Sequence, residues 1–167
     1  TCVLFGDAAG AVVLEKGENL LASKLTSDGN VEVLNIPHVY GNSPFSNDEK
    51  KSSYLYMDGH GVYKFAFTAM APGLSETIAA AGLKPEDVDH VLPHQANLRI
   101  IQAAMKKLDI PEDRYRTNIA HYGNTSSACI PVLLDELNQA GMLKRGQILA
   151  LTAFGGGLTT GAMVLRW

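Results

Sequence analysis

Apolar side chains recur along the chain at two spacings, and each spacing predicts one kind of element. From residue 61 to residue 81 they recur at helical spacing, and Pro72 should kink this helix or end its first part. Two further helices are predicted, one capped at its start by Asn97 and the other ending before Gly141. The predicted helices cover residues 61–81, 97–108 and 126–140.

Short apolar runs bounded by turn residues predict strands at residues 10–15, 20–25, 89–93, 115–119, 147–153 and 161–166. A turn at residues 16–19 separates the first two strands, and residues 35–54, which contain Pro37 and Pro44, are predicted as an exposed loop. From there strands and helices alternate, and the last two strands follow one another directly. This order predicts an α/β fold with a mostly parallel sheet and an antiparallel hairpin at one edge.

Composition narrows the class of protein. Hydrophobic residues make up 46% of the 167 residues and charged residues 19%, which excludes intrinsic disorder and suggests that much surface is buried, in a core or against a partner. The net charge of −3 gives no indication of nucleic-acid binding. No apolar run reaches the ~18 residues that a membrane span needs.

The cysteines and histidines give no metal-like pattern. Cys2 and Cys129 stand far apart, which favours reduced thiols in a cytosolic protein over a disulfide. Cys129 falls inside the third predicted helix and is expected to pack in the core as a small apolar group. His90 and His94 are four residues apart, but Pro93 lies between them on a predicted strand, so they would not share a helix face.

Three short motifs each follow a predicted strand, where ligands bind in open α/β sheets. His94 precedes a helix whose positive end favours the neutral imidazole, Asn124 follows Gly123 before the next helix, and residues 155–157 are consecutive glycines. Each motif has a structural alternative. His94 could satisfy buried backbone, Asn124 could belong to an N-cap cluster, and the glycines could form a bulged turn.

The three motifs together favour a chemical role over these alternatives. A neutral imidazole, a side-chain amide and backbone N–H groups in a glycine loop are all hydrogen-bond donors suited to a carbonyl oxygen. The combination predicts a site that stabilises an enolate or an oxyanion. The Gly-x-Ser-x-Gly motif of serine hydrolases and the phosphate-binding P-loop are both absent from the sequence.

Four segments resemble the β-ketoacyl-acyl-carrier-protein synthase III family, the initiating condensing enzymes of bacterial fatty-acid synthesis. They are FGDAAGAVVLE (5–15), PHQANLRI (93–100), HYGNTSSA (121–128) and AFGGGLTTGAMVLRW (153–167). They occur in the family's order across essentially the whole chain, and the loop at 35–54 is the least similar segment.

The resemblance implies a thiolase-like half with a mixed five-stranded sheet and helices on both faces, part of an α/β/α/β/α sandwich. Residues 1–25 would be the truncated end of the amino-terminal half, and residues 26–167 the carboxyl-terminal half. The family implies a cytoplasmic homodimer that uses no cofactor, has no membrane or nucleic-acid partner, and takes acyl-CoA and acyl-carrier protein as substrate and partner.

The resemblance also implies decarboxylative Claisen condensation of acyl-CoA with malonyl-acyl-carrier protein by a Cys-His-Asn triad. His94 and Asn124 match the histidine and the asparagine, and Gly156 matches the oxyanion-hole donor. The nucleophilic cysteine is expected outside this chain, because neither Cys2 nor Cys129 lies in its motif. The isolated chain is therefore expected to be inactive in condensation.

Further positions match the family's binding surfaces. Those expected to contact substrate or coenzyme A are Gly59, Tyr63, Ala96, Asn97 and Phe154. Those expected to dock the acidic carrier protein are Lys64, Arg99, Lys106 and Lys107. Arg99 and Lys106 are seven residues apart, which is two helical turns, so both should point the same way. An ordinary solvent-exposed helix face would show the same spacing of charges.

Two alternatives stay open at the level of sequence. One is another Cys-His-Asn enzyme of the thiolase fold, such as a polyketide starter synthase or a hydroxymethylglutaryl-coenzyme A synthase. The other is a non-catalytic fragment that only binds coenzyme A or carrier protein. The pairing of HQANLRI with GNTSSA favours the fatty-acid enzyme.

Overall fold

The computed structural model describes residues 3–37 and 54–167. Within these ranges the strands are β1 (Leu20–Ser27), β2 (Leu34–Asn35), β3 (Tyr56–Met57), β4 (His90–Pro93), β5 (Ile148–Gly155) and β6 (Thr159–Arg166). The helices are α1 (Gly59–Ala80), α2 (Leu98–Lys107), α3 (Ile119–Tyr122) and α4 (Cys129–Gln139), with 3₁₀ turns η1 (Pro85–Asp87) and η2 (Ser126–Ala128). The three predicted helices are confirmed, as are the predicted strands that correspond to β1, β4, β5 and β6.

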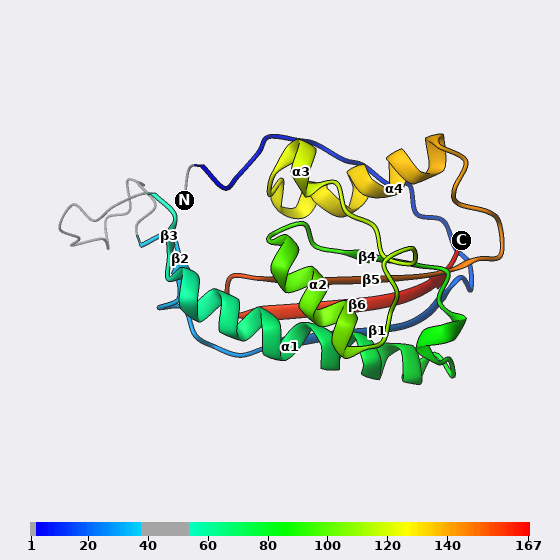
Figure 1. Ribbon diagram of the computed structural model, residues 1–167, viewed down its shortest axis with the longest axis horizontal. Helices are drawn as coiled ribbons and strands as arrows, with labels where there is room; N and C mark the ends of the chain where they lie inside the picture. Colours follow the sequence, from blue (N-terminus) through cyan, green and yellow to red (C-terminus); the bar gives the residue numbers. More distant parts are fainter. Residues whose placement is uncertain (1–2, 38–53) are drawn as a thin grey trace.

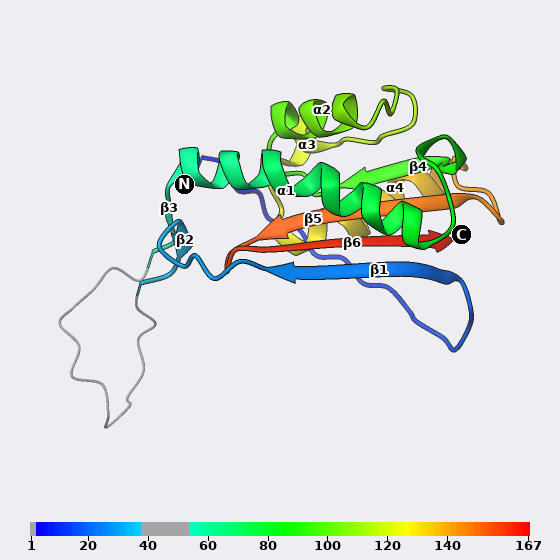
Figure 2. The same ribbon diagram turned by 90° about the horizontal axis from the view of Figure 1, so that it is seen from below.

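The main sheet is mixed and covered on both faces. Its strand order is β1-β6-β5-β4, with β4 parallel to β5 and the other neighbours antiparallel. Figures 1 and 2 show α1 and α2 on one face and α4 on the other. The α/β class and the helices on both faces are confirmed. The expectation of a mostly parallel sheet is wrong, because β1 adds to the hairpin of β5 and β6 in antiparallel orientation.

Among the described residues the sheet has four strands, whereas five were expected. The predicted strand at 115–119 forms only one parallel bridge, between Tyr115 and Val91. Two backbone hydrogen bonds flank it, from Val91 N to Arg114 O at 2.7 Å and from Arg116 N to Val91 O at 3.0 Å. The helix α3 follows almost at once, so the extended segment is too short to lengthen the ladder.

Side chains of the central strands alternate between two cores, as the period of a strand requires. On the side of α1 and α2, the first core contains Val91, Ala150 and Val164 with Met70, Leu74, Ile101 and Met105. On the side of α4, the second core contains Leu92 and Leu149 with Leu133, Leu137 and Leu143. The carboxyl ends of β4 and β5 therefore extend from strands that are packed from both sides.

The helix α1 is the longest element and runs for 22 residues without a break at Pro72. The Asp58 carboxylate caps its start by accepting a hydrogen bond from the His60 backbone N–H at 3.0 Å. Met70 and Leu74, four residues apart, are both buried, which confirms the predicted apolar stripe. No helix in the described ranges combines the length and the apolar character needed to cross a membrane.

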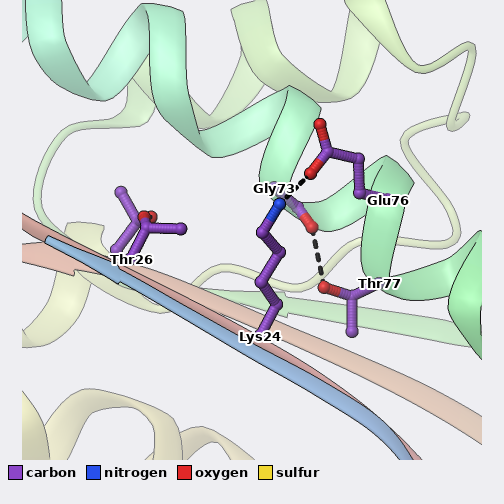
Figure 3. A network of polar contacts seen from close by, with 6 residues as sticks. Lys24, Thr26, Gly73, Glu76 and Thr77 are labelled. Carbon is purple, nitrogen blue, oxygen red and sulfur yellow. Dashed lines mark hydrogen bonds and ion pairs between the residues drawn. The ribbon is translucent and has the colours of Figure 1, made fainter.

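The strand β1 joins this sheet through its ladder with β6 and through polar contacts on its surface. Figure 3 shows the Lys24 ammonium paired with the Glu76 carboxylate of α1, and Thr26 makes a side-chain hydrogen bond with Thr160 of β6. Because the Lys24 and Glu76 side chains are 44% and 57% exposed, their ion pair adds little stability. The predicted division of the chain after residue 25 falls within β1 and stays a prediction.

The segment before β1 forms no strand, and the prediction for residues 10–15 is wrong. Val13 and Leu14 there are 98% and 88% exposed. Among the described residues, no strand lies beside this segment to pair with it. Figure 1 shows the segment passing over α3 and along α4, where Phe5 forms a single bridge with Asn124.

The loop predicted at residues 35–54 lies between β2 and β3, which pair as a short antiparallel ladder. Residues 38–53 are outside the described residues, so the exposed loop stays a prediction there.

Candidate active site

A cavity of about 1020 Å³ opens at the carboxyl ends of β4 and β5. It is lined by eight of the residues singled out from the sequence, namely Gly59, Tyr63, His94, Ala96, Asn97, Asn124, Phe154 and Gly156. These residues come from α1, from the loop after β4, from the loop after α3, and from the end of β5 with the turn that follows it. Four segments far apart in the sequence thus meet at one hollow.

His94 is the first residue after β4, and its backbone N–H continues the pairing with β5 by donating to Thr152 O at 2.7 Å. The imidazole Nδ1 lies 3.0 Å from the Cys129 Sγ at the start of α4. The ring meets Phe154 edge to face, with 5.4 Å between ring centroids. Nε2 has no hydrogen-bond partner among the described residues, so this nitrogen is left available to a ligand.

Burial keeps the His94 imidazole neutral. Desolvation lowers the pKa of His94 from 6.5 to about 4, and no neighbouring charge contributes. The neutral form expected from the sequence is therefore confirmed. Burial in the cavity wall produces this shift, and the contribution expected from the following helix stays a prediction. At neutral pH the ring carries one hydrogen, which it can donate to an acceptor.

Asn124 follows Gly123, whose φ of 68° is the left-handed conformation that a side chain would disfavour. The amino-terminal segment holds the Asn124 backbone, since Asn124 N donates to Leu4 O and Gly6 N donates to Asn124 O, both at 3.0 Å. The side-chain Oδ1 accepts a hydrogen bond from Ser126 N at 2.9 Å. The amide therefore does cap the following turn, and its Nδ2 remains without a partner among the described residues.

The glycine turn between β5 and β6 forms another wall of the cavity. Gly157 has a φ of 140°, and a Cβ at this residue would lie 2.7 Å from the Thr159 Cγ2. Glycine is therefore required there on steric grounds. Gly156 is exposed in the cavity, and its backbone N–H has no hydrogen-bond partner within the described ranges. The glycine segment can therefore both form a tight turn and offer a backbone N–H donor, the two roles considered for it from the sequence.

Gln95 is a structural link that the sequence did not reveal. Its fully buried side chain uses both ends of its amide. Nε2 donates to Pro93 O at 2.7 Å and to Arg116 O at 3.3 Å, and Oε1 accepts from Asn118 N at 2.9 Å and Ile119 N at 3.2 Å. It thereby ties the loop that carries His94 to the segment that leads to Asn124.

Two other contributors were missed because they depend on distant contacts. The contact of Cys129 with His94 joins residues 35 positions apart, and nothing in the sequence pattern signals it. The pairing of Leu4 and Gly6 with Asn124 spans more than a hundred positions. Cys129 is buried and its thiol is free, as expected, whereas Cys2 lies outside the described residues.

The four cations expected to dock a carrier protein lie outside the cavity. Lys64 is exposed on the first turns of α1, beside the cavity residue Tyr63. Arg99 is exposed on the first turn of α2, close to Asn97, whose Oδ1 caps that helix by accepting from Arg99 N at 2.9 Å. Lys106 and Lys107 are exposed on its last turn, about 10 Å further along the axis.

Within residues 3–37 and 54–167, the cavity combines hydrogen-bond donors with no cysteine thiolate beside them. His94 Nε2, Asn124 Nδ2 and Gly156 N are all available, whereas burial raises the pKa of the Cys129 thiol and keeps it protonated. Among the described residues, no group of three or more His, Cys, Asp or Glu side chains could hold a metal ion. The arrangement is suited to bind a substrate oxygen that becomes negatively charged.

Two family models match the chain. The model described as 3-oxoacyl-[acyl-carrier-protein (ACP)] synthase III C terminal matches residues 78–167, and the model described as 3-oxoacyl-[acyl-carrier-protein (ACP)] synthase III matches residues 1–29. The first match alone covers more than half of the chain and includes His94, Asn124 and Gly156.

Curated relatives and solved structures agree with these matches. The β-ketoacyl-[acyl-carrier-protein] synthase III of Clostridium acetobutylicum is 46% identical over 172 residues, which cover 100% of this chain and 53% of that protein. The crystal structure of 3-oxoacyl-[acyl-carrier-protein] synthase III from Aquifex aeolicus matches with a TM-score of 0.84 at 38% identity, over 100% of this chain and 51% of that one. The corresponding structure from Thermus thermophilus matches with a TM-score of 0.83 at 39% identity, over 100% and 53%. The chain spans about half the length of the curated relatives it matches.

Proposed function

The chain belongs to the 3-oxoacyl-[acyl-carrier-protein] synthase III family, and we propose that it supplies the decarboxylating part of a condensing enzyme's active site. The proposed reaction is the decarboxylative Claisen condensation of an acyl-CoA with malonyl-acyl-carrier protein. One observation carries this proposal. His94 Nδ1 contacts Cys129 Sγ and Asn124 Oδ1 accepts from Ser126 N, so each side chain has one remaining nitrogen available in the same cavity.

The first chemical step is the loss of CO₂ from the malonyl thioester. The electron pair of the broken C–C bond passes to the thioester carbonyl, which becomes an enolate. His94 Nε2–H and Asn124 Nδ2–H donate to this oxygen, and their hydrogen bonds strengthen as the charge develops. Donors of this kind raise the rate more than they tighten substrate binding, and the loss of one typically costs about 3 kcal/mol.

The second step is the attack of the enolate carbon on an acyl group held as a thioester on a cysteine. We place this cysteine in the part of the relatives that the chain does not span. Gly156 N–H donates to the oxygen of the tetrahedral intermediate, which then expels the cysteine thiolate. Cys129 does not take the nucleophile's role, because its side chain is 2% exposed and in contact with His94.

The substrate arm is proposed to enter between the starts of α1 and α2. Gly59, Tyr63, Ala96 and Asn97 line this side of the cavity, and Phe154 packs against the His94 ring. An acidic carrier protein would meet the exposed cations at these helix starts, and the thioesters of coenzyme A and of the carrier protein are substrates. No cofactor takes part in this scheme.

Lys64 and Arg99 stand beside cavity-lining residues, so they are proposed as the nearer docking contacts. Lys106 and Lys107, at the far end of α2, would extend the same surface.

We also infer that the complete enzyme is a cytoplasmic homodimer. The free, buried Cys129 thiol is consistent with a reducing compartment. The exposed apolar side chains of Val12, Val13, Leu14 and Leu25 are consistent with burial against further protein, either the remaining half or a second subunit. Light scattering on the complete enzyme measures its subunit number directly, and a monomer would contradict the dimer.

The test uses a hybrid in which this chain replaces the matching part of the Clostridium acetobutylicum synthase. We expect the hybrid to condense acetyl-CoA with malonyl-acyl-carrier protein and the 167-residue chain alone to form no acyl-enzyme. The substitution His94→Ala should slow malonyl decarboxylation by about 100-fold or more and leave acyl transfer from acetyl-CoA largely intact. The substitution His121→Ala, at an exposed histidine outside the cavity lining, is the matched control.

Normal decarboxylation by the His94→Ala hybrid would show that the role given to this residue is wrong. A hybrid that binds coenzyme A or carrier protein but catalyses neither step would favour the non-catalytic alternative. Charge reversal of Lys64 and Arg99 gives a further arm, since it should raise the KM for malonyl-acyl-carrier protein and not for acetyl-CoA.

A further inference from the structure

Cys129 is a buried group in direct contact with the candidate site that the proposed chemistry does not use. It is the first residue of α4, and its side chain is 2% exposed. Its Sγ lies 3.0 Å from His94 Nδ1, and the Gln95 backbone N–H donates to the same sulfur at 3.5 Å. The thiol therefore touches the back of the imidazole while Nε2 remains without a partner among the described residues.

We infer that Cys129 is a positioning residue whose S–H donates to His94 Nδ1 and so keeps the imidazole hydrogen on Nε2. A neutral histidine carries one hydrogen, and the hydrogen bond made by one ring nitrogen decides which nitrogen holds it. The inference rests on the proposed function, because the tautomer matters to the reaction only if Nε2 donates to the substrate oxygen.

The direction of this hydrogen bond follows from the contacts of the sulfur. The Gln95 N–H already occupies one lone pair of Sγ, so the thiol hydrogen needs an acceptor, and His94 Nδ1 lies within reach. If Nδ1 carried the hydrogen, two N–H groups would face the sulfur, and its own S–H would lose that acceptor in a buried site. Burial also raises the pKa of the Cys129 thiol and lowers that of His94, which keeps both groups neutral.

The two proposed donors are then oriented by one short segment. Ser126 N donates to Asn124 Oδ1 at 2.9 Å, which leaves Nδ2 available, and Cys129, three residues later, contacts His94 Nδ1 at 3.0 Å, which leaves Nε2 available. Asn124 is held through Oδ1 and His94 through Nδ1, and these are the atoms that must not face the substrate oxygen. With the wrong tautomer, His94 would present a lone pair to the carbonyl oxygen and repel it.

The experiment compares Cys129→Ala with Cys129→Ser in the hybrid described above. A serine hydroxyl can donate to Nδ1 as the thiol does, whereas alanine cannot. The ¹⁵N chemical shifts of labelled histidine report the tautomer, and the signal lost in His94→Gln assigns His94. The signals of the other histidines show whether each variant keeps its fold.

We expect His94 to carry its hydrogen on Nε2 in the parent hybrid and in Cys129→Ser, and to show a mixture of tautomers in Cys129→Ala. The kcat for malonyl decarboxylation should fall by about tenfold in Cys129→Ala with little change in KM, and Cys129→Ser should restore most of it.

Two results would overturn the inference. One is a Cys129→Ala variant that keeps the single Nε2–H tautomer and the parent kcat. The other is a Cys129→Ser variant as impaired as Cys129→Ala, since that result would assign Cys129 a packing role. If the parent hybrid does not decarboxylate malonyl thioesters but the tautomer still depends on residue 129, the hydrogen bond is supported and the proposed function fails.

Discussion

The two edges of the main sheet differ in packing, and His94 follows directly on the edge strand that is better packed, β4. Every residue of β4 is buried, because helices cover both of its faces. None of the eight residues of β1 is fully buried, and Leu25 is 85% exposed. The amino-terminal segment is similar to β1 in this respect, with Val13 98% exposed.

This difference assigns separate physical roles to the two regions. Hydrogen-bond donors that stabilise a developing charge must be held in place before the reaction, which requires a rigid base. The β4 and β5 side provides one through two cores and the buried Gln95 amide. The β1 side instead carries exposed apolar surface, which is the property of a region that packs against further protein.

The largest expected effect contrasts a core leucine with an edge leucine. Leu149→Ala on β5 should lower the free energy of unfolding by about 2–5 kcal/mol, because the side chain is completely buried and leaves a cavity. Leu25→Ala on β1 should change it by less than about 0.5 kcal/mol, because that side chain is largely exposed. Urea unfolding of the two variants measures both values, and similar losses would remove the distinction between the two edges.

The second effect is a dependence of the free energy of unfolding on pH, and it arises from His94 in the candidate site. The pKa of His94 is about 4 in the folded chain and 6.5 in the unfolded reference, so between these pH values the unfolded chain binds more protons. The free energy of unfolding should therefore fall as the pH falls from 6.5 toward 4, by up to about 3 kcal/mol from His94. Burial lowers the pKa of His90 in the same direction.

Unfolding measured at several pH values separates the two histidines. His94→Gln should remove most of the slope between pH 6.5 and 4, and His90→Gln should remove the part that is due to His90. A slope that is unchanged in His94→Gln would assign the effect to another group.

The smallest expected effect lies on the β1 edge. Lys24→Ala removes the ion pair with Glu76 shown in Figure 3, and both side chains are about half exposed. Solvent screens such pairs, so the expected loss is below about 1 kcal/mol. A double-mutant cycle with Glu76→Ala measures the pair itself, and a coupling as large as a core substitution would show that β1 is held more firmly than its exposure indicates.

Much of the fold could be predicted because it depends on local periodicity. The helical spacing of apolar residues located α1, and short apolar runs located β4, β5 and β6. Periodicity does not say which strand lies beside which. The prediction of a mostly parallel sheet was therefore wrong, and so was the prediction of a strand at residues 10–15. A strand also needs a partner, and the apolar run at 10–15 has none in the described structure.

The site shows the same division between local and distant information. Motifs and their family resemblance singled out His94, Asn124 and Gly156, which the structure brings to one cavity. The groups that orient them could not be predicted, because the contact of Cys129 with His94 and the bonds of Gln95 to Asn118 and Ile119 join separate parts of the chain. The cause of the neutral imidazole was also beyond the sequence, since burial is a property of the fold.

The central claim is that His94 and Asn124 donate to one substrate oxygen. The most direct test is a double-mutant cycle of His94→Ala and Asn124→Ala on malonyl decarboxylation by the hybrid. Each single substitution should lower the rate by about 100- to 1,000-fold, and the double substitution should cost clearly less than the product of the two, because both donors act on the same atom. Losses that multiply independently, or a rate that either single substitution leaves unchanged, would contradict the account.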